Sequence, residues 1–316
     1  MPNPSLPHVP GDKPDAVLRA EIALDQVTSV LMRDPRLRVT PGGSGIVVER
    51  AHSTSVVFIR YLRGAGVLSG IDYPVIFISS YLSDETVSFP RDVVVRGCGL
   101  NARAALGALV EKPRCPVGGI AHCSSIGIDT DWSWQSIGRE LTVAAIIFGM
   151  HAVFGQPLAR RHSDTSALEA FSHEVMAMPQ ESPDRYRILR QRPDFVYAKP
   201  CDFEAGTKAA VFMGIGALHP IIGPGLEYRL YLSLGIESLA KGAALVEFLN
   251  AMEREHAVGA PHIGAWHIPR DRTGPCYTVH IPARLATSTR GIPQKLLDTT
   301  YRRVSAVKQW LKDYPM

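Results

Sequence analysis

The sequence predicts a mixed fold of the α/β or α+β class, with a strand–glycine turn–helix unit flanked by antiparallel hairpins. Two observations lead to this prediction. Apolar residues recur at helical spacing in several segments, and short β-rich runs separated by Gly, Pro and Ser lie between them. In the middle, residues 91–112 read RDVVVRGCGLNARAALGALVEK, which is typical of a short strand, a glycine turn and a helix that stops before Pro113.

The composition is that of a globular protein with a sizeable core. The chain has 316 residues, of which 46% are hydrophobic and 20% charged, far from the composition of disordered chains. Its formal net charge of +4 includes no long block of Lys or Arg, so nucleic acid is not the expected partner. The length corresponds to one large domain or two smaller ones.

Cysteine usage and the start of the chain predict a cytoplasmic protein. The first fifteen residues, MPNPSLPHVPGDKPD, have no apolar stretch and read as a proline-rich mobile arm rather than a secretory signal. The longest apolar run, residues 141–154, is too short to span a bilayer, so no membrane association is expected. The five cysteines contain no Cys-x-x-Cys pair, which favours reduced thiols: Cys98, Cys115, Cys123, Cys201 and Cys276.

The N-terminal region, residues 16–178, is expected to begin with a helix over residues 16–32, which Asp34-Pro35 closes. The pattern then changes to closely spaced β-rich pieces, which predict a small antiparallel sheet. The glycines of residues 64–70 leave no room for a crossover helix, so they predict a hairpin. The β-rich pieces are residues 37–39, 46–48, 56–62 and 75–78.

Two helices are expected next, over residues 135–154 and from residue 163 or 164 to about 176. Residues 179–200 are charged and punctuated by proline, which favours a connector or lid. The C-terminal region, residues 201–316, is expected to contain an amphipathic helix over residues 236–256. Two strands that form a hairpin, residues 263–268 and 276–281, and a last helix over residues 293–312 follow it. We find no internal repeat in the sequence, and the two regions could equally form one continuous domain.

The glycine turn after Val95 is the first candidate binding site. A strand that enters a helix through such a turn directs free backbone N–H groups and the positive end of the helix dipole to one point. The G-x-G-x-x-A spacing fits the dinucleotide fingerprint, but the acid that should follow the next strand is replaced by Ala-His-Cys-Ser. We expect a phosphate-bearing ligand, such as a nucleotide or dinucleotide cofactor, to contact Gly97, Gly99 and Asn101, with charge from Arg96 and Arg103.

Two short patterns resemble those of known families. Residues 97–109 are similar to the glycine-turn segment of ornithine cyclodeaminase-like reductases, but no flanking pattern extends the similarity. Gly118-Gly119 followed by Asp129-Thr130-Asp131 resembles the glycine motif and paired aspartates of polymerase β-type nucleotidyltransferases, which hold magnesium. The basic residue after the glycines and the third acid of that pattern are missing, so an acidic helix N-cap is the alternative.

Histidines provide the second candidate site. Imidazoles and carboxylates are good ligands for zinc or iron, and His151, in an apolar helix, has the character of an axial haem ligand. The two C-terminal strands should bring two imidazoles onto one face if they pair. This alternative describes a metal or haem enzyme, an oxygenase or hydrolase, with ligands from His162, Asp164, His173, His267 and His280.

His122 and Cys98 are the expected catalytic residues. A thiol at a helix N-terminus has a lowered pKa, which favours thiolate chemistry at Cys98. His122 precedes Cys123, but neighbours on a strand point to opposite faces, so their adjacency is no evidence of a dyad. The leading hypothesis is a cytoplasmic enzyme that acts on a small molecule; the alternatives are the metal or haem enzyme and a non-catalytic ligand-binding or interaction protein. A homodimer is compatible with each.

Overall fold

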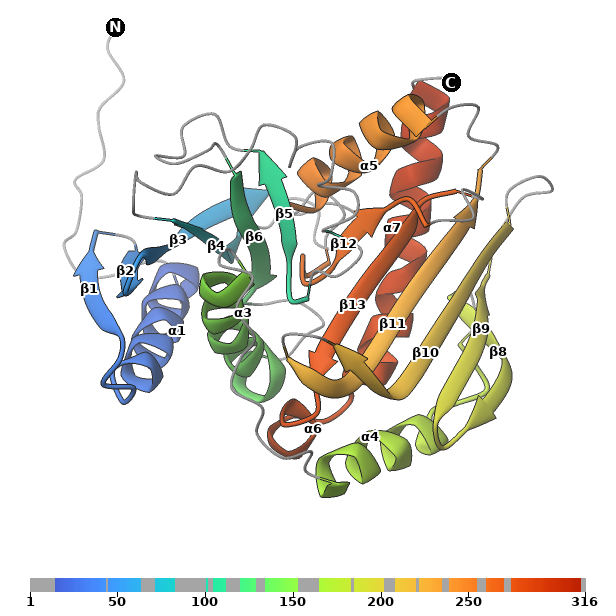
Figure 1. The fold of residues 1–316 in the computed structure, drawn as a ribbon, viewed down its shortest axis with the longest axis horizontal. Helices are drawn as coiled ribbons and strands as arrows, with labels where there is room; N and C mark the ends of the chain where they lie inside the picture. Colours follow the sequence, from blue (N-terminus) through green and yellow to red (C-terminus); the bar gives the residue numbers. More distant parts are fainter. Residues whose placement is uncertain are drawn as a thin grey trace, which may run out of the picture.

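The computed structural model describes the chain from residue 15 to residue 313 with several gaps. The described ranges are 15–43, 45–63, 72–82, 101, 105–111, 120–128, 134–152, 165–182, 185–201, 208–219, 222–234, 239–254, 260–269 and 274–313. In these ranges the chain forms helices and two antiparallel sheets (Figure 1). The predicted mixed α+β class with antiparallel hairpins is confirmed.

The N-terminal half builds the first sheet. It runs as helix α1 (Asp15–Leu31), strands β1 (Arg38–Gly42), β2 (Gly45–Arg50), β3 (Ser53–Arg63), β4 (Asp72–Leu82), β5 (Ala108–Glu111) and β6 (Ile120–Gly127), then π-helix η2 (Trp134–Gly138) and helix α3 (Arg139–Ala152). The strand order is β1-β2-β3-β4-β6-β5, and every neighbouring pair is antiparallel. Helices α1 and α3 lie side by side along one face (Figure 1).

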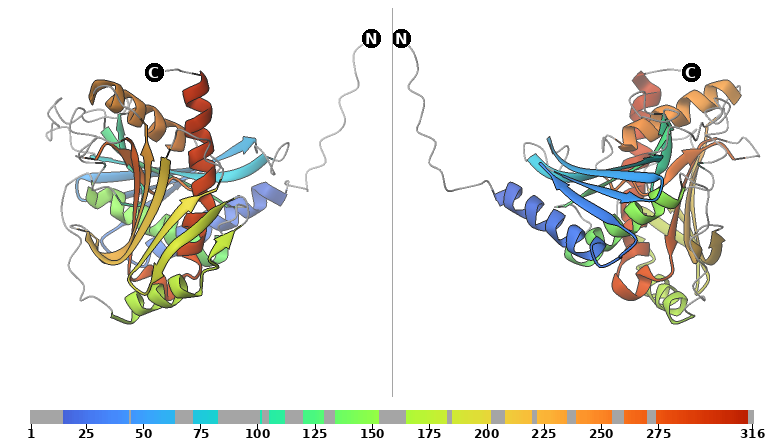
Figure 2. Two further views of the ribbon diagram at one scale, coloured as in Figure 1. Left: turned by 90° about the vertical axis from the view of Figure 1, so that its right-hand side faces the viewer. Right: turned by 60° about the vertical axis from the view of Figure 1, so that its left-hand side comes forward.

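The C-terminal half builds the second sheet. Its elements are α4 (Thr165–Ala177), β7 (Glu181–Ser182), β8 (Tyr186–Arg192), β9 (Phe195–Pro200), β10 (Lys208–His219), β11 (Gly223–Ser233), α5 (Leu239–Arg254), β12 (Ala265–His267), β13 (Cys276–Pro282), α6 (Leu285–Ser288) and α7 (Ile292–Asp313). The strand order is β12-β13-β11-β10-β9-β8-β7. Helix α7 runs along this sheet, as the side view in Figure 2 shows.

Apolar periodicity explains where the helices pack. Helix α1 buries Ala20, Ala23, Leu24, Val27 and Leu31, a stripe with the three- and four-residue spacing of one helix face. Helix α3 is apolar on most sides because it lies between the two sheets. The ring of its Phe148 lies 5.2 Å from that of His122 in β6 and 6.0 Å from that of His219 in β10.

Two expectations about single segments are wrong. The Ala- and Leu-rich run before Pro113 does not stay helical, because residues 108–111 form β5 and pair antiparallel with β6. Leu106 adopts a positive φ of 54°, which a continuing helix does not allow. Residues 179–200, expected as a connector or lid, contain β7, β8 and β9 of the second sheet. In the part of the chain that the structure describes, no helix is long and apolar enough to cross a membrane.

Candidate functional site

Most of the predicted glycine turn lies outside the described residues, namely Arg96, Gly97, Cys98, Gly99 and Arg103. Asn101 is described and is helical. Its Nδ2 donates to the Leu109 carbonyl at 3.0 Å, and the Leu109 N–H donates to its Oδ1 at 2.8 Å. The Asn101 amide therefore holds strand β5 through two backbone hydrogen bonds and is itself buried. Phosphate binding at this turn stays a prediction.

His122, the other residue expected to be catalytic, is fully buried in the first sheet. Its Nε2–H donates to the Ala105 carbonyl at 3.1 Å. Burial lowers the pKa of His122 to about 4, against the opposing effect of this hydrogen bond. Its imidazole packs under α3 beside Phe148, so in the described part of the chain it belongs to the core between β6 and α3.

The described residues among the predicted metal and haem ligands lie in three places: helix α4, the end of α3 and the C-terminal hairpin. His162 and Asp164 lie outside the described residues, whereas His173 is exposed on α4. His151 lies at the end of α3, where its Nε2 is 2.6 Å from Nη1 of Arg50. Among the described residues, no group of three or more His, Cys, Asp or Glu side chains is arranged to hold a metal ion.

The C-terminal hairpin, in contrast, is confirmed. Strands β12 and β13 pair antiparallel, with His267 opposite Cys276. His280 follows Cys276 by four residues on the same strand, so both imidazoles face the same side of the sheet, as expected from the sequence.

Strand β11 adds charged and aromatic side chains to this side. Because antiparallel partners share a face, the pairing of Glu227 with His280, Arg229 with Thr278 and Tyr231 with Cys276 produces one continuous polar surface. We call this set of residues the polar face: Glu227, Arg229, Tyr231, His267, Cys276, Thr278 and His280. The opposite side of the same strands is apolar and packs toward α7, where the Tyr228 hydroxyl lies 2.6 Å from that of Thr300.

Glu227 joins two groups of the polar face. Its Oε1 lies 3.3 Å from Nε2 of His280 and 2.6 Å from Nη2 of Arg229. The Glu227 and His280 side chains are 10% and 9% exposed, whereas that of Arg229 is 40% exposed. Glu227 therefore contacts a buried imidazole on one side and a solvent-exposed guanidinium on the other.

The histidines of the polar face are held neutral. Burial, together with charge repulsion from His219, Arg229 and His267, lowers the pKa of His280 to about 3. Burial likewise lowers the pKa of His267 to about 4. Burial also disfavours the charge of Arg229, but hydrogen bonds to Tyr231 and Glu227 keep its pKa above the ordinary value.

Nε2 of His280 lies 3.3 Å from Oε1 of Glu227, and because a carboxylate only accepts hydrogen bonds, a neutral His280 can act as a donor to it only with the proton on Nε2. Its Nδ1 is then a proton acceptor. The ring of His219 lies beside it, with the centroids 4.6 Å apart, and the ring of Phe148 in α3 lies 6.0 Å from that of His219. An imidazole that can take a proton, backed by a carboxylate that stabilises the resulting cation, is the arrangement that general bases use.

The second histidine belongs to a neighbouring chain of polar contacts. Nε2 of His267 is 2.8 Å from the Thr278 hydroxyl, which in turn lies 3.5 Å from the Cys276 thiol. All three side chains are buried. The sequence pattern identified His267 and His280 but missed the three residues that β11 contributes, Glu227, Arg229 and Tyr231. The alternation of apolar and polar residues in Leu-Glu-Tyr-Arg-Leu-Tyr-Leu is the pattern that could have indicated them.

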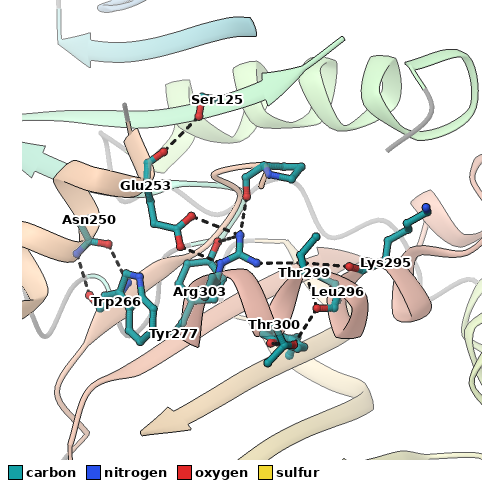
Figure 3. A network of polar contacts seen from close by, with 12 residues as sticks. Ser125, Asn250, Glu253, Trp266, Tyr277, Lys295, Leu296, Thr299, Thr300 and Arg303 are labelled. Atoms are coloured by element: carbon teal, nitrogen blue, oxygen red, sulfur yellow. Dashed lines mark hydrogen bonds and ion pairs between the residues drawn. The ribbon is translucent and has the colours of Figure 1, made fainter. Parts of the chain in front are cut away.

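A second polar network, behind the sheet, is closed and structural (Figure 3). Arg303 of α7 bonds Glu253 of α5 at 2.8 Å and the Pro261 carbonyl at 2.8 Å, and it lies 4.2 Å from the ring centroid of Tyr277. Both charged side chains are 1% exposed. With its guanidinium bonded on several sides, Arg303 joins α7 and α5 to strand β13.

Comparison with protein-family models, curated proteins and solved structures finds no match for this chain.

Proposed function

We propose that this protein is an enzyme that acts on a small anionic molecule, with His280 and Glu227 as its acid–base pair. The observation that carries the proposal is the contact between His280 and Glu227 in the interior of the polar face, with Arg229 at its solvent edge. Buried ionisable groups with strongly shifted pKa values occur preferentially at functional sites.

The roles follow from the chemistry of each group. Arg229 and the Tyr231 hydroxyl, which Nη1 of Arg229 approaches to 3.2 Å, offer hydrogen-bond donors to a carboxylate or phosphate of the substrate. His280 accepts a proton at Nδ1 while its Nε2–H stays next to the Glu227 carboxylate. Glu227 then stabilises the imidazolium that has formed.

Binding of an anionic substrate should also raise the pKa of His280. The positive charge of Arg229 lowers the pKa of His280, and an anion on Arg229 would cancel part of that effect. The pKa of His280 then rises from its low value, which makes the imidazole a stronger base, although burial, the largest cause of the low pKa, remains. Substrate binding and activation of the base are thereby linked through Arg229.

Thermal-shift screening with small carboxylates and phosphorylated metabolites tests the proposal, because a ligand of the folded state raises Tm. We expect some of these anions to raise the Tm of the wild type but not that of Arg229→Ser, and to be turned over by the wild type but not by His280→Gln. Replacement of the exposed His173 by Gln is the matched control. Anions that stabilise all these variants equally would contradict the proposal, and binding without turnover would favour a non-catalytic ligand-binding protein.

The phosphate-binding turn at Gly97–Asn101 is a separate proposal that rests on the sequence alone. Its support is the strand–glycine turn pattern, and replacement of Gly99 with Val tests it. The two proposals are compatible, since a phosphate at the turn and acid–base chemistry on the polar face concern different residues.

A further inference from the structure

We infer that the chain consists of two copies of one folding unit, and that the charged and imidazole side chains of the polar face are an addition carried only by the second copy. Each half runs helix, four antiparallel strands, two further antiparallel strands, short helical segment, helix. The second half adds strand β7 ahead of the four strands and has helix α5 before the last two; of the corresponding segment in the first half only Asn101, which is helical, is described. The elements α1, β1, β2, β3, β4, β5, β6 and α3 correspond in order to α4, β8, β9, β10, β11, β12, β13 and α7. The sheets share the order β1-β2-β3-β4-β6-β5 and β8-β9-β10-β11-β13-β12, in which the last two strands are reversed in both.

An asparagine performs the same task in both halves. Asn250 in α5 donates from Nδ2 to the Trp266 carbonyl at 2.9 Å and accepts from the Trp266 N–H at 2.8 Å. Asn101 makes the same two bonds, 3.0 and 2.8 Å long, to Leu109. Leu109 and Trp266 are each the second residue of their strand, and each asparagine stands in a Leu-Asn-Ala sequence.

A Gly-Ala pair precedes both of these bonded residues. A Cβ on Gly107 would lie 2.5 Å from the Cys123 carbonyl oxygen, and one on Gly264 would lie 2.5 Å from that of Thr278. The following alanines pair with these same residues, Ala108 with Cys123 and Ala265 with Thr278. The close approach that requires glycine therefore recurs at the same place in both halves.

The two copies meet at equivalent residues. Ala108 of β5 and Ala265 of β12 pack against each other in one small apolar cluster. Contact between a residue and its own counterpart is the mark of a two-fold arrangement, as at the centre of a symmetric dimer interface. The chain thus has the architecture of a dimer joined into one polypeptide.

The strand register then gives the counterpart of each residue on the polar face. If Cys123 corresponds to Thr278, then Ser125 corresponds to His280, and their partners Phe77 and Glu227 correspond to each other. By the same register Ser79 replaces Arg229 and Val110 replaces His267. The first sheet forms without these charged and imidazole side chains, so the fold does not require them.

This difference has an energetic consequence that can be measured. Burying polar and charged groups opposes folding unless their hydrogen bonds compensate, and apolar replacement of such groups is often neutral or stabilising. Replacing residues of the polar face by their counterparts should therefore leave Tm unchanged or raise it. If the polar face served only to stabilise the fold, the same replacements would lower Tm.

The test uses the full chain and two sets of variants. The first set, Asn101→Leu and Asn250→Leu, removes the two equivalent bonds; both should lower Tm by several degrees, and the Asp variants, which can still accept from the backbone N–H, should lose less. The second set is the double variant Glu227→Phe/His280→Ser, which copies the pair Phe77 and Ser125, with His267→Val and Arg229→Ser as smaller changes in case the double variant does not fold.

The outcomes separate this inference from the proposed function, on which its second part rests. A Tm loss at only one of the two asparagines would overturn the duplication, whatever a ligand does. A clear Tm loss in His267→Val would overturn the claim that the fold does not require the polar face, whereas Arg229→Ser alone leaves the Glu227 carboxylate without its cation and is compared only for anion binding. If the counterpart variants keep their Tm and still show the full thermal shift with an anion that stabilises the wild type, the proposed function fails while the duplication stands.

Discussion

Oε1 of Glu227 lies 3.3 Å from Nε2 of His280, on neighbouring strands of the second sheet and almost out of contact with water. The same carboxylate bonds Arg229, whose guanidinium reaches solvent. This connection between a buried base and an exposed cation distinguishes the polar face from the closed network around Arg303.

The low pKa values of the buried histidines predict a pH-dependent stability. His122 and His267 titrate near 4 and His280 near 3 in the folded protein, all below the ordinary value of 6.5. At pH values between these low pKa values and 6.5, the unfolded chain binds more protons than the folded protein does. The stability is therefore fully present above about pH 6.5 and falls as the pH is lowered. Each such histidine should contribute up to about 1.4 kcal/mol of loss per pH unit. Urea unfolding at pH 7 and pH 5 measures this, and His267→Val should reduce the slope, whereas the exposed His173→Gln should not.

Breaking the buried ion pair should be strongly destabilising. Glu253→Gln leaves Arg303 charged and buried, and we expect a loss of about 3–5 kcal/mol in the free energy of unfolding. Replacing both residues, as in Glu253→Leu/Arg303→Met, should recover much of that loss. Glu181→Gln, which breaks an exposed pair with Arg187, is the control and should change stability by less than about 1 kcal/mol. Equal effects of Glu253→Gln and Glu181→Gln in urea unfolding would contradict this account of the network.

The glycine turn can be tested independently of the polar face. Replacing Gly99 with Val should abolish binding of a phosphate-bearing ligand at the turn while the far-UV circular dichroism spectrum stays unchanged, because a β-branched side chain blocks close approach to the backbone N–H groups. Thermal shift with nucleotides and phosphorylated metabolites provides the measurement. Unchanged binding in Gly99→Val would remove the turn from consideration.

Local pattern predicted a large part of the fold, since the helices α1, α3, α4, α5 and α7 and the hairpin of β12 and β13 follow from periodicity and turn residues. The sequence failed where a distant contact overrides propensity. Residues 105–111 are rich in Ala and Leu, yet pairing with β6 and the two bonds from Asn101 hold residues 108–111 as a strand. The sequence did not predict the duplication either, because the two halves share strand order, strand register and a few Asn, Gly and Ala positions but no recognisable sequence repeat.

The candidate site shows the same limit. The paired strands and the shared face of His267 and His280 could be predicted from the hairpin, because register within a hairpin is local. Glu227 and Arg229 come from β11, which neighbours β13 only after a helix and an intervening strand. No local sequence pattern predicts that β11 and β13 are neighbours, so only the structure identifies Glu227 as the partner of His280.

The most direct test of the account is an NMR pH titration of the His280 imidazole in the wild type and in Glu227→Gln. We predict that at pH 7 the wild-type ring is neutral with its proton on Nε2, that its pKa lies well below 6.5, and that an anion found in the screen raises this pKa. The Gln variant should lose the preference for the Nε2 proton. An imidazole that titrates near 6.5 in both proteins, with no preferred tautomer and no response to the anion, would contradict the central claim that Glu227 and His280 form the acid–base pair.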